Sequence, residues 1–542
     1  MILADSGNRR VLMERIAVRW HAPTHAIPVD LFRILVGLLS CAYFAHLFAQ
    51  ARDFSSPGGL IDHGLTREIF WYTRLGLFHP GMDTGAFLVV FALAIAASCA
   101  LVAGYRPKLM AAFMFTVAVS AYRWNFLVIY VDDAIMHLVL FWMMMLPVGR
   151  TLALGDWLSD RPAAAERWKR EMVPGGTLRA FLISLALVYV VAGAWKWTSP
   201  MWRDGTALYA ALRTPISLAP EFWGPQHLTA LRWADYSTLV LEPLFPVMFL
   251  LPVNHRLKWA LLVAMIAFHA GIVATMRIPY ANLACLAAAV IIFREEIMCR
   301  IPRTTIVSMR VASPPRDVCA TASLAFVTLL SLAMVGDASV PAWRSPTREA
   351  RTSRVGTAPV VKSGAPESEA RAGFLGTQHN PLYSPLWLIG IAQSYRLFDW
   401  IDDRNFHIHY TVVERLRDGT TRPIDATELF PQSIRAVLLQ TYMHGVTWGK
   451  VPSERADDLR VALHHRFAQR FCRKRSVTGE VEVSAAVARI SPELGDVLPA
   501  SELIARFSCD SGAARLQYVR LGDGRGMAIF RPRRPSVAQG PR

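Results

Sequence analysis

The sequence predicts an α-helical polytopic membrane bundle of about nine transmembrane helices, followed by a C-terminal extracytoplasmic α+β domain. Of its 542 residues, 53% are hydrophobic and only 18% are charged, and the mean hydropathy is +0.30. Soluble domains carry roughly 25% charged residues. The apolar residues gather into blocks close to the ~20 residues that a helix needs to cross a bilayer core of ~30 Å. An ordinary soluble enzyme is therefore excluded.

The first 27 residues form the predicted cytoplasmic N-terminal segment. They contain Arg9, Arg10, Arg15 and Arg19 and no small-residue cleavage site, so we expect the first span to act as an uncleaved signal anchor. The segment RVLMERIAVRW (10–20) places its apolar residues on one helical face, which is typical of a helix lying along the membrane surface. A short solvated helix is the alternative.

The membrane domain is predicted to cover residues 28–335. Its apolar blocks lie at 29–49, 85–103, 108–122, 132–148, 178–195, 235–252, 257–276, 278–293 and 318–335.

The basic residues predict the orientation of these spans. Alternate connecting segments carry nineteen Lys and Arg residues on one side and nine on the other. Because positively charged loops stay in the cytoplasm, the N-terminus is predicted to be cytoplasmic and the chain after residue 335 external. The net charge of +17 therefore suggests contact with membrane lipid. No nucleic-acid motif is present, and no nucleic-acid partner is predicted.

The external part divides into a linker, 336–373, and a small α+β domain, 374–542. The linker is rich in Ser, Pro, Gly, Ala and Arg and has too little apolar content to fold alone. In the domain, FHIHYTVVERL, Asp418-Gly419 and TRPID read as a hairpin. Segment 453–473 reads as a helix capped by Ser453. VEVSAAVARI reads as a further strand, and LQYVRLGDGRGMAIF reads as two strands joined by a turn at 522–526.

The usual soluble-enzyme sites are weakly represented in this domain. His407 and His409 share a strand face but have no evident third ligand, so no metal site is predicted. The glycines at 522–526 precede no helix and do not form a phosphate loop. Cys472 and Cys509 share the external compartment, where disulfides form, and pairing and non-pairing remain equally open.

Ionisable residues inside the spans are the first candidates for a functional site, because charge at membrane depth is costly. Those that stand out are Arg33, Asp133, His137, Lys196, Glu242 and His269. Asp133 and His137 lie four residues apart and so share a helical face, which could relay a proton. The alternative is structural: Arg33 could pair with Glu242 or Asp133 to neutralise charge, and His269 could simply join two helices.

The fifth span carries the most specific pattern. Tyr189, Gly193 and Lys196 share one face, and Gly193 leaves room for another helix or a ligand. Lys196 lies between Trp195 and Trp197, where partial desolvation favours a neutral amine that can act as a base. The alternative is a lysine that extends to the interface beside ordinary interfacial tryptophans. Because Asp133, His137 and Lys196 all fall in the external half of their spans, we predict that one externally open cavity collects them.

Several ordered strings then resemble a known family. They are FRILVGLL, LVAGYRPKL, NFLVIYVDDAIMHLVLFWMMMLPVGR, YVVAGAWKWTSPMWRDGTALY, EP in the sixth span and AFHAGIVATM. Between roughly residues 25 and 300 the chain resembles the HTTM (horizontally transferred transmembrane) family, bacterial relatives of vitamin K-dependent γ-carboxylase, and the external segment NPLYSPLWLIGIAQSYRLF is similar to the soluble tail of bacterial members.

The resemblance implies an enzyme-like protein of the bacterial inner membrane. In the carboxylase, a lysine in an AGxxK-like segment deprotonates a reduced vitamin K, and Lys196 in AGAWKW matches it; His269 matches a histidine of the seventh span. The cofactor implied is a reduced quinone. Where the carboxylase has an Asn and His segment, this chain reads NFLVIYVDD, so glutamate carboxylation is not expected.

Two functions follow. The first is proton-abstraction or oxygenation chemistry on a lipophilic quinol or similar substrate. Its predicted catalytic residues are Lys196, Asp133, His137 and His269, and its predicted substrate-binding residues are Arg33, Asp132, Tyr189, Trp195, Trp197 and Glu242. The second is a non-catalytic role in the maturation or export of a secreted peptide, which the resemblance to another bacterial relative implies.

Overall fold

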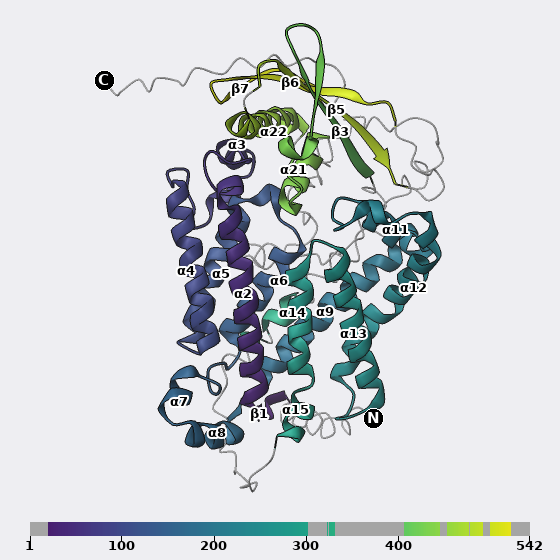
Figure 1. The fold of residues 1–542 in the computed structure, drawn as a ribbon. Coiled ribbons are helices and arrows are strands. Elements are labelled where there is room, and N and C mark those ends of the chain that lie inside the picture. Colours follow the sequence, from purple (N-terminus) through teal and green to yellow (C-terminus); the bar gives the residue numbers. More distant parts are fainter. Residues whose placement is uncertain are drawn as a thin grey trace, which may run out of the picture.

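The computed structural model describes residues 20–301, 322–323, 325–330, 406–444, 453–475, 477–490 and 499–521. Within these ranges the chain forms a bundle of helices with a five-stranded sheet at one end, which we call the sheet end (Figure 1). The predicted surface helix at 10–20 (except residue 20), the linker at 336–373 and the turn at 522–526 lie outside the described residues.

Helices of the bundle overlap eight of the predicted apolar blocks, and shorter helices that were not predicted lie between them. In chain order the helices of this region are α2 (Ala26–Phe54), α3 (His63–Ile69), α4 (Thr84–Ala103), α5 (Pro107–Trp124), α6 (Val131–Met145), α7 (Leu154–Ser159), α8 (Arg161–Arg170), α9 (Gly176–Thr198), α10 (Pro200–Asp204), α11 (Ala207–Arg213), α12 (Leu228–Leu244), α13 (Arg256–Thr275), α14 (Pro279–Ile292) and α15 (Arg294–Arg300). Short 3-10 helices are η1 (Trp71–Arg74), η2 (Phe126–Val128), η3 (Pro220–Phe222), η4 (Pro225–His227) and η5 (Phe245–Phe249).

Four of the described helices, α2, α4, α9 and α13, are long and apolar enough to cross a membrane. Helix α14 is apolar but has only 14 residues. Helices α5, α6 and α12 coincide with three more predicted spans without meeting both criteria. Of the ninth predicted span, residues 325–330 are described and helical, and the Phe326 ring centroid lies 4.5 Å from that of Phe141 on α6.

The sixth predicted span is displaced along the chain. We predicted 235–252, whereas α12 begins at Leu228 and passes at Phe245 into η5. Pro243 and Pro246 explain the change, because proline has no backbone N–H to donate within the last turns of an α-helix.

The C-terminal region is a sheet backed by helices. Its elements are β3 (Phe406–Arg415), β4 (Thr421–Ile424), α20 (Ala426–Leu429), α21 (Ile434–Met443), α22 (Ser453–Lys474), β5 (Glu480–Arg489), β6 (Glu502–Asp510) and β7 (Ala513–Val519). The sheet is antiparallel with the order β4-β3-β5-β6-β7. The predicted hairpin at Asp418-Gly419 and the predicted strand at 481–490 are confirmed, and β6 was not predicted. Helix α22 confirms the predicted helix, while its cap lies outside the described side chains.

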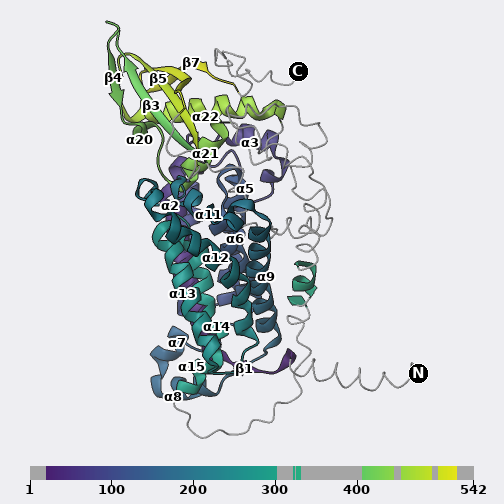
Figure 2. The same ribbon diagram turned by 90° about the vertical axis from the view of Figure 1, so that its right-hand side faces the viewer.

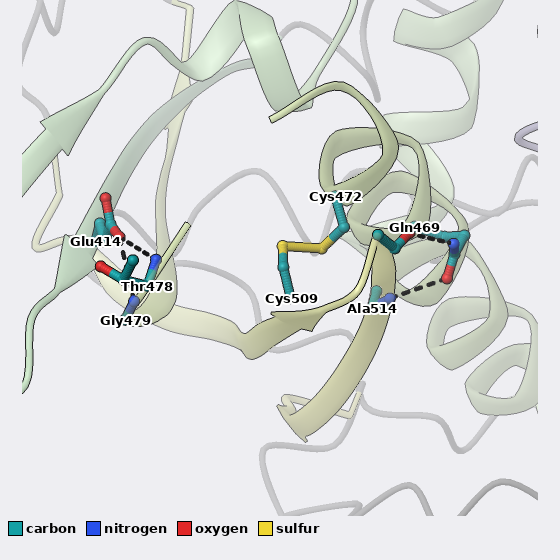
Figure 3. Close-up of a disulfide and its surroundings, with 8 residues drawn as sticks. Glu414, Gln469, Cys472, Thr478, Gly479, Cys509 and Ala514 are labelled. Carbon is teal, nitrogen blue, oxygen red and sulfur yellow. Dashed lines mark hydrogen bonds between the residues drawn. A yellow bond between two sulfur atoms is a disulfide. The ribbon is translucent and has the colours of Figure 1, made fainter. Parts of the chain in front are cut away.

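Cys472 and Cys509 form a disulfide, with the two Cα atoms 5.4 Å apart (Figure 3). It joins α22 to β6. On the same side of the sheet, the amide oxygen of Gln469 accepts a hydrogen bond from the Ala514 N–H at 3.0 Å, so the helix is also tied to β7. The open question of pairing is thereby settled.

The C-terminal region and the bundle share one hydrophobic core at the sheet end. Helices α21 and α22 lie between the sheet and the bundle in both views (Figures 1 and 2). The segment 53–70, from the end of α2 through α3, is called the first bundle loop. Its residues Phe54, Leu60, Ile61 and Phe70, with residues 126–128, belong to the same buried cluster as the apolar face of α22 and the sheet. A second, larger cluster fills the bundle itself.

Arginines on α22 strengthen this docking. They contact acidic or carbonyl groups of the first bundle loop, in the pairs Arg455–Glu68 at 3.1 Å, Arg466–Asp62 at 3.2 Å, Arg470–Asp53 at 3.2 Å and Arg473 with the carbonyl of Gly58 at 3.1 Å. The first loop therefore matches α22 in both charge and apolar surface.

Candidate functional site in the outer half of the bundle

Lys196 lies near the end of α9 in a buried ion pair. Its Nζ is 2.5 Å from the Oε2 of Glu242 on α12, and the two side chains are only 3% and 5% exposed. The ammonium also lies 5.3 Å from the centre of the Trp202 ring. Lys196 therefore does not extend to the interface, and the alternative of an interfacial lysine does not hold.

Gly193 makes this ion pair geometrically possible. A Cβ atom placed on Gly193 would be 3.1 Å from Cδ of Pro243, the residue after Glu242. The missing side chain lets α12 approach α9 closely, as predicted. Contact between the two helices brings the carboxylate of Glu242 to the amine of Lys196.

Two turns before Lys196 on the same face, Tyr189 begins a chain of buried hydrogen bonds. The Tyr189 hydroxyl is 2.8 Å from Nε2 of His269 on α13, and Nδ1 of His269 is 2.8 Å from Oδ1 of Asn282 on α14. Asn282 donates its amide to the carbonyl of Ile278 at 2.6 Å, so its oxygen faces the imidazole as an acceptor. A neutral His269 then carries its proton on Nδ1 and accepts from Tyr189 at Nε2.

Asp132 joins this chain to the next group. Its Oδ1 accepts a hydrogen bond at 2.7 Å from the N–H of Ala281, in the first turn of α14 and next to Asn282. A carboxylate is favoured there because the helix N-terminus has unpaired N–H groups and a partial positive charge. The other oxygen, Oδ2, is buried and has no hydrogen-bond partner among the described residues.

Asp133 binds an arginine from the C-terminal region. Nη2 of Arg435, on α21, is 2.7 Å from Oδ1 of Asp133, and both side chains are buried. The Tyr43 hydroxyl donates to the same oxygen at 2.7 Å. Arg435 also donates to the carbonyl of Val128 at 3.1 Å and lies over the Tyr130 ring at 5.2 Å.

Asp133 and His137 share one face of α6, as their spacing predicted, and the described partners of the carboxylate and of the imidazole differ. The Asp133 carboxylate is taken by Arg435, Tyr43 and the Tyr130 N–H, the last at 3.3 Å. The His137 ring instead packs edge to face on Tyr122, with centroids 5.0 Å apart. Both residues lie on one helical face, but the cation from α21 competes successfully for the carboxylate.

The structural alternative in which Arg33 pairs with Glu242 or Asp133 is wrong. Arg33 pairs with Asp30, one turn earlier on α2, at 2.8 Å, and both side chains are fully buried. Its guanidinium also donates to the carbonyls of Leu101, Val102 and Leu152. Asp30 accepts from the N–H groups of 149–151. These contacts hold loops at the end of the bundle opposite the sheet, so Arg33 is a structural residue apart from the site.

The two tryptophans beside Lys196 differ. Trp195 is buried, whereas Trp197 is 51% exposed and donates its indole N–H to the carbonyl of Leu239 at 3.0 Å. Trp197 therefore helps to fix the contact of α9 with α12 and has the half-exposed position typical of an interfacial residue.

Some of the predicted site residues contact one another, as Lys196 does Glu242 and Tyr189 does His269, but none of them lines the two cavities found in the described chain. One cavity of about 230 Å³ lies beside α5 and Gly76, and one of about 630 Å³ lies between the starts of α5 and α9. None of the predicted site residues lines either of them. Instead, Lys196, Glu242, Tyr189 and His269 are all buried side chains, packed where α9, α12 and α13 meet.

Across the part of the chain that the structure describes, no group of three or more His, Cys, Asp or Glu side chains is placed to hold a metal ion. His407 and His409 lie side by side on β3, with ring centroids 4.4 Å apart.

Tyr43, Asn282 and Arg435 were not predicted as site residues. Asn282 could have been found by the criterion that found His269, because it is a polar residue in an apolar helix. Arg435 has no such signal, since it lies in an ordinary amphipathic segment. No family description, curated protein or solved structure matches this chain.

Proposed function

We infer that the chain is a nine-span protein of a bacterial inner membrane, with its N-terminus in the cytoplasm and the C-terminal α+β domain outside. Helices at eight of the predicted positions and helical residues at the ninth support the number of spans. The disulfide between Cys472 and Cys509 supports an oxidising compartment for the C-terminal region.

The proposed activity is proton abstraction from a lipophilic hydroquinone, in keeping with the resemblance to the γ-carboxylase relatives. The observation that carries it is the ion pair of Lys196 and Glu242, buried among membrane helices next to Tyr189 and His269. A buried ion pair contributes little net stability compared with apolar packing, and this one, unlike the buried Lys258–Glu296 pair, lies beside the hydrogen-bonded Tyr189 and His269.

The residues present fit a hydroquinone by their chemistry. Lys196 and Glu242 offer a proton acceptor, and Trp202 and Tyr189 offer aromatic surface beside it. When the proton of the pair lies on Glu242, Lys196 is a neutral amine and can accept the proton of a hydroxyl group, leaving the oxygen negatively charged. Tyr189 and His269 hold the adjacent polar groups in a fixed orientation. A bound hydroquinone would supply the acidic hydroxyl and the electrons for later oxygen chemistry.

The test is a double substitution that leaves no charge unpaired, Lys196→Met with Glu242→Gln, in the full-length protein in lipid nanodiscs. The probe is a short-chain prenylated naphthohydroquinone with dissolved oxygen as the oxidant, and its oxidation above the rate without protein is followed by absorbance. We expect a roughly hundredfold or greater loss of turnover, the usual contribution of a general base. Equal turnover in the variant and the native protein would overturn the proposal.

The chain offers a matched control. Lys258 and Glu296 form another buried ion pair at 2.6 Å, at the opposite end of the bundle. Lys258→Met with Glu296→Gln removes the same charges and should leave turnover unchanged. A loss in both double variants would indicate a general effect of destabilisation.

The alternative is a non-catalytic accessory in the maturation or export of a secreted peptide. The contact between Arg435 and Asp133 favours it, because that contact fixes the C-terminal region over the bundle as one rigid surface on which a peptide could bind. Under this alternative, the Lys196 and Glu242 substitutions leave peptide maturation intact, and removal of the C-terminal region abolishes it.

A further inference from the structure

The larger cavity, of about 630 Å³, lies at the end of the bundle opposite the sheet. It is formed where three connections come together: the turn between α4 and α5, residues 145–150 after α6, and the start of α9. Helices α7 and α8 lie at the same end (Figure 1). Its volume falls within the ~300–1,000 Å³ usual for small-molecule sites.

The lining of this cavity has a single sign of charge. Arg106, Lys108 and Arg150 line it, all three are exposed, and no acidic residue is among the lining residues. The nearby carboxylate of Asp30 accepts from Arg33 and from the N–H groups of 149–151, so it is already balanced. Helix α5 begins at Pro107, so the partial positive charge of its N-terminus adds to the three cations.

The other wall of the cavity is apolar. Leu109, Met145 and Val148 contribute to it. Leu109 is 55% exposed, and on α7 the side chains of Leu154 and Leu158 are 48% and 68% exposed. Exposed leucines beside exposed arginines match the boundary between lipid headgroups and acyl chains.

The cavity is held open by backbone contacts and is therefore preorganised. Gly149 has a φ of 82°, and a Cβ atom there would be 2.6 Å from Cγ of Pro107, so only glycine allows this approach of the two connections. The Asp30 carboxylate fixes the same connection through the N–H groups of Gly149, Arg150 and Thr151. A preorganised site loses less entropy when a ligand binds.

We propose that this cavity binds the phosphate headgroup of an anionic phospholipid from the cytoplasmic leaflet. The inference rests on the proposed membrane orientation and does not depend on the hydroquinone chemistry. The three cations bind the phosphate, and Leu109, Met145 and Val148 contact the first part of the acyl chains. A zwitterionic lipid binds less well, because its choline group brings a positive charge among three others.

Native mass spectrometry of the full-length protein in mixed micelles tests the proposal. The probes are phosphatidylglycerol, cardiolipin and phosphatidylcholine at equal concentration, with inorganic phosphate as a competitor. The native protein should retain the anionic lipids preferentially. Each basic residue near a membrane surface contributes roughly fivefold to affinity, so Arg106→Asn, Lys108→Gln and Arg150→Gln together should weaken retention by one to two orders of magnitude.

A triple variant with equal loss of charge is the control. Lys169→Gln, Arg170→Gln and Arg256→Gln lie at the same end of the bundle, do not line the cavity and should leave retention unchanged. Equal effects of the two triple variants would overturn the proposal in favour of diffuse attraction to the surface. Displacement of lipid by millimolar inorganic phosphate would overturn the lipid assignment in favour of a free anion.

A second measurement does not depend on a folded variant. A phosphatidylglycerol with a photoreactive group near the glycerol should label peptides containing residues 105–109 and 145–150 of the native protein. Labelling confined to other peptides contradicts the site. Alkaline phosphatase fusions test the membrane orientation separately, and the Lys196 and Glu242 variants test the hydroquinone proposal separately.

Discussion

At the scale of single residues, two buried arginines have the same structural task at opposite ends of the molecule. Arg33 joins α2 to loops through Asp30 and backbone carbonyls, and Arg435 joins α21 to α6 through Asp133. Burial opposes the charged form of Arg435, yet the carboxylate of Asp133 raises the pKa of Arg435 overall. The guanidinium therefore stays charged at every pH at which the protein is folded, and Asp133 keeps its partner.

Arg435→Met should weaken the docking of the C-terminal region. It leaves the Asp133 carboxylate buried without its cation, which typically costs about 3–5 kcal/mol. We expect a lower thermal unfolding temperature in detergent and faster cleavage of the C-terminal region by protease.

Two further variants control this prediction. Adding Asp133→Leu to Arg435→Met removes the unpaired charge and should restore much of the stability. Arg415→Met removes an ion pair in which the arginine is 52% exposed and should change stability by at most about 1 kcal/mol. If Arg415→Met destabilised the protein as much as Arg435→Met, the importance of the buried pair would be refuted.

At the scale of helices and strands, apolar length was the part of the fold that could be predicted. Helices α2, α4, α9 and α13 follow continuous apolar blocks and were located within a few residues. Strand β6 was missed because its pairing with β7 shifts register between Arg506 and Phe507, so its buried positions do not alternate regularly. A bulge of this kind removes the two-residue period on which strand prediction depends.

The sequence predicted which polar residues belong to the candidate site better than it predicted which of them contact one another. Lys196, Glu242 and His269 were identified because polar groups are rare in apolar segments. Their partners depend on contacts that the local pattern does not encode: Arg435 lies 302 residues from Asp133 in sequence. Tyr43, Asn282 and Arg435, which complete the hydrogen bonds around the predicted residues, were not predicted, and the cavity remains a prediction for these residues.

Two buried histidines under the sheet, His444 and His464, predict that the free energy of unfolding falls in acid. Burial, together with the nearby charge of Arg460, lowers the pKa of His444 and of His464, each to about 3. In the unfolded chain these groups titrate near 6.5. The unfolded state therefore binds more protons, and stability that is complete above pH 6.5 should be lost progressively as the pH falls towards 3.

We expect the free energy of unfolding to fall by at least about 2 kcal/mol between pH 6.5 and pH 4, measured by thermal unfolding at several pH values. His444→Gln with His464→Gln should flatten this dependence. His79→Gln, at an exposed position, should leave it unchanged. An equally steep pH dependence in the double variant would show that other groups cause the acid response.

At the scale of the whole molecule, the bundle and the C-terminal region form one body, joined by a shared core and by the arginines of α22. Figure 2 shows the sheet on the far side of α22 from the bundle. The polar site lies towards the sheet end, whereas the proposed lipid cavity lies at the opposite end. The two candidate sites therefore lie towards opposite ends of the bundle.

The proposed orientation predicts which fusions are active. Alkaline phosphatase fused after residue 521 should be active in intact cells, and the same enzyme fused after Arg170 should be inactive. Cys472 and Cys509 should react with maleimide only after reduction, whereas the exposed Cys299 should react in permeabilised cells without it. Activity of the fusion after Arg170 alone would reverse the orientation.

The core shared by the first loop and α22 also constrains how the chain is assembled during synthesis. Phe54, Leu60 and Ile61 emerge from the ribosome some 400 residues before the apolar face of α22 that covers them. Until α22 has been synthesised, that loop has an uncovered hydrophobic surface that attracts chaperones or a neighbouring nascent chain. If translation stops before α22, the inserted precursor keeps this hydrophobic surface exposed and is degraded by proteases that recognise such surfaces.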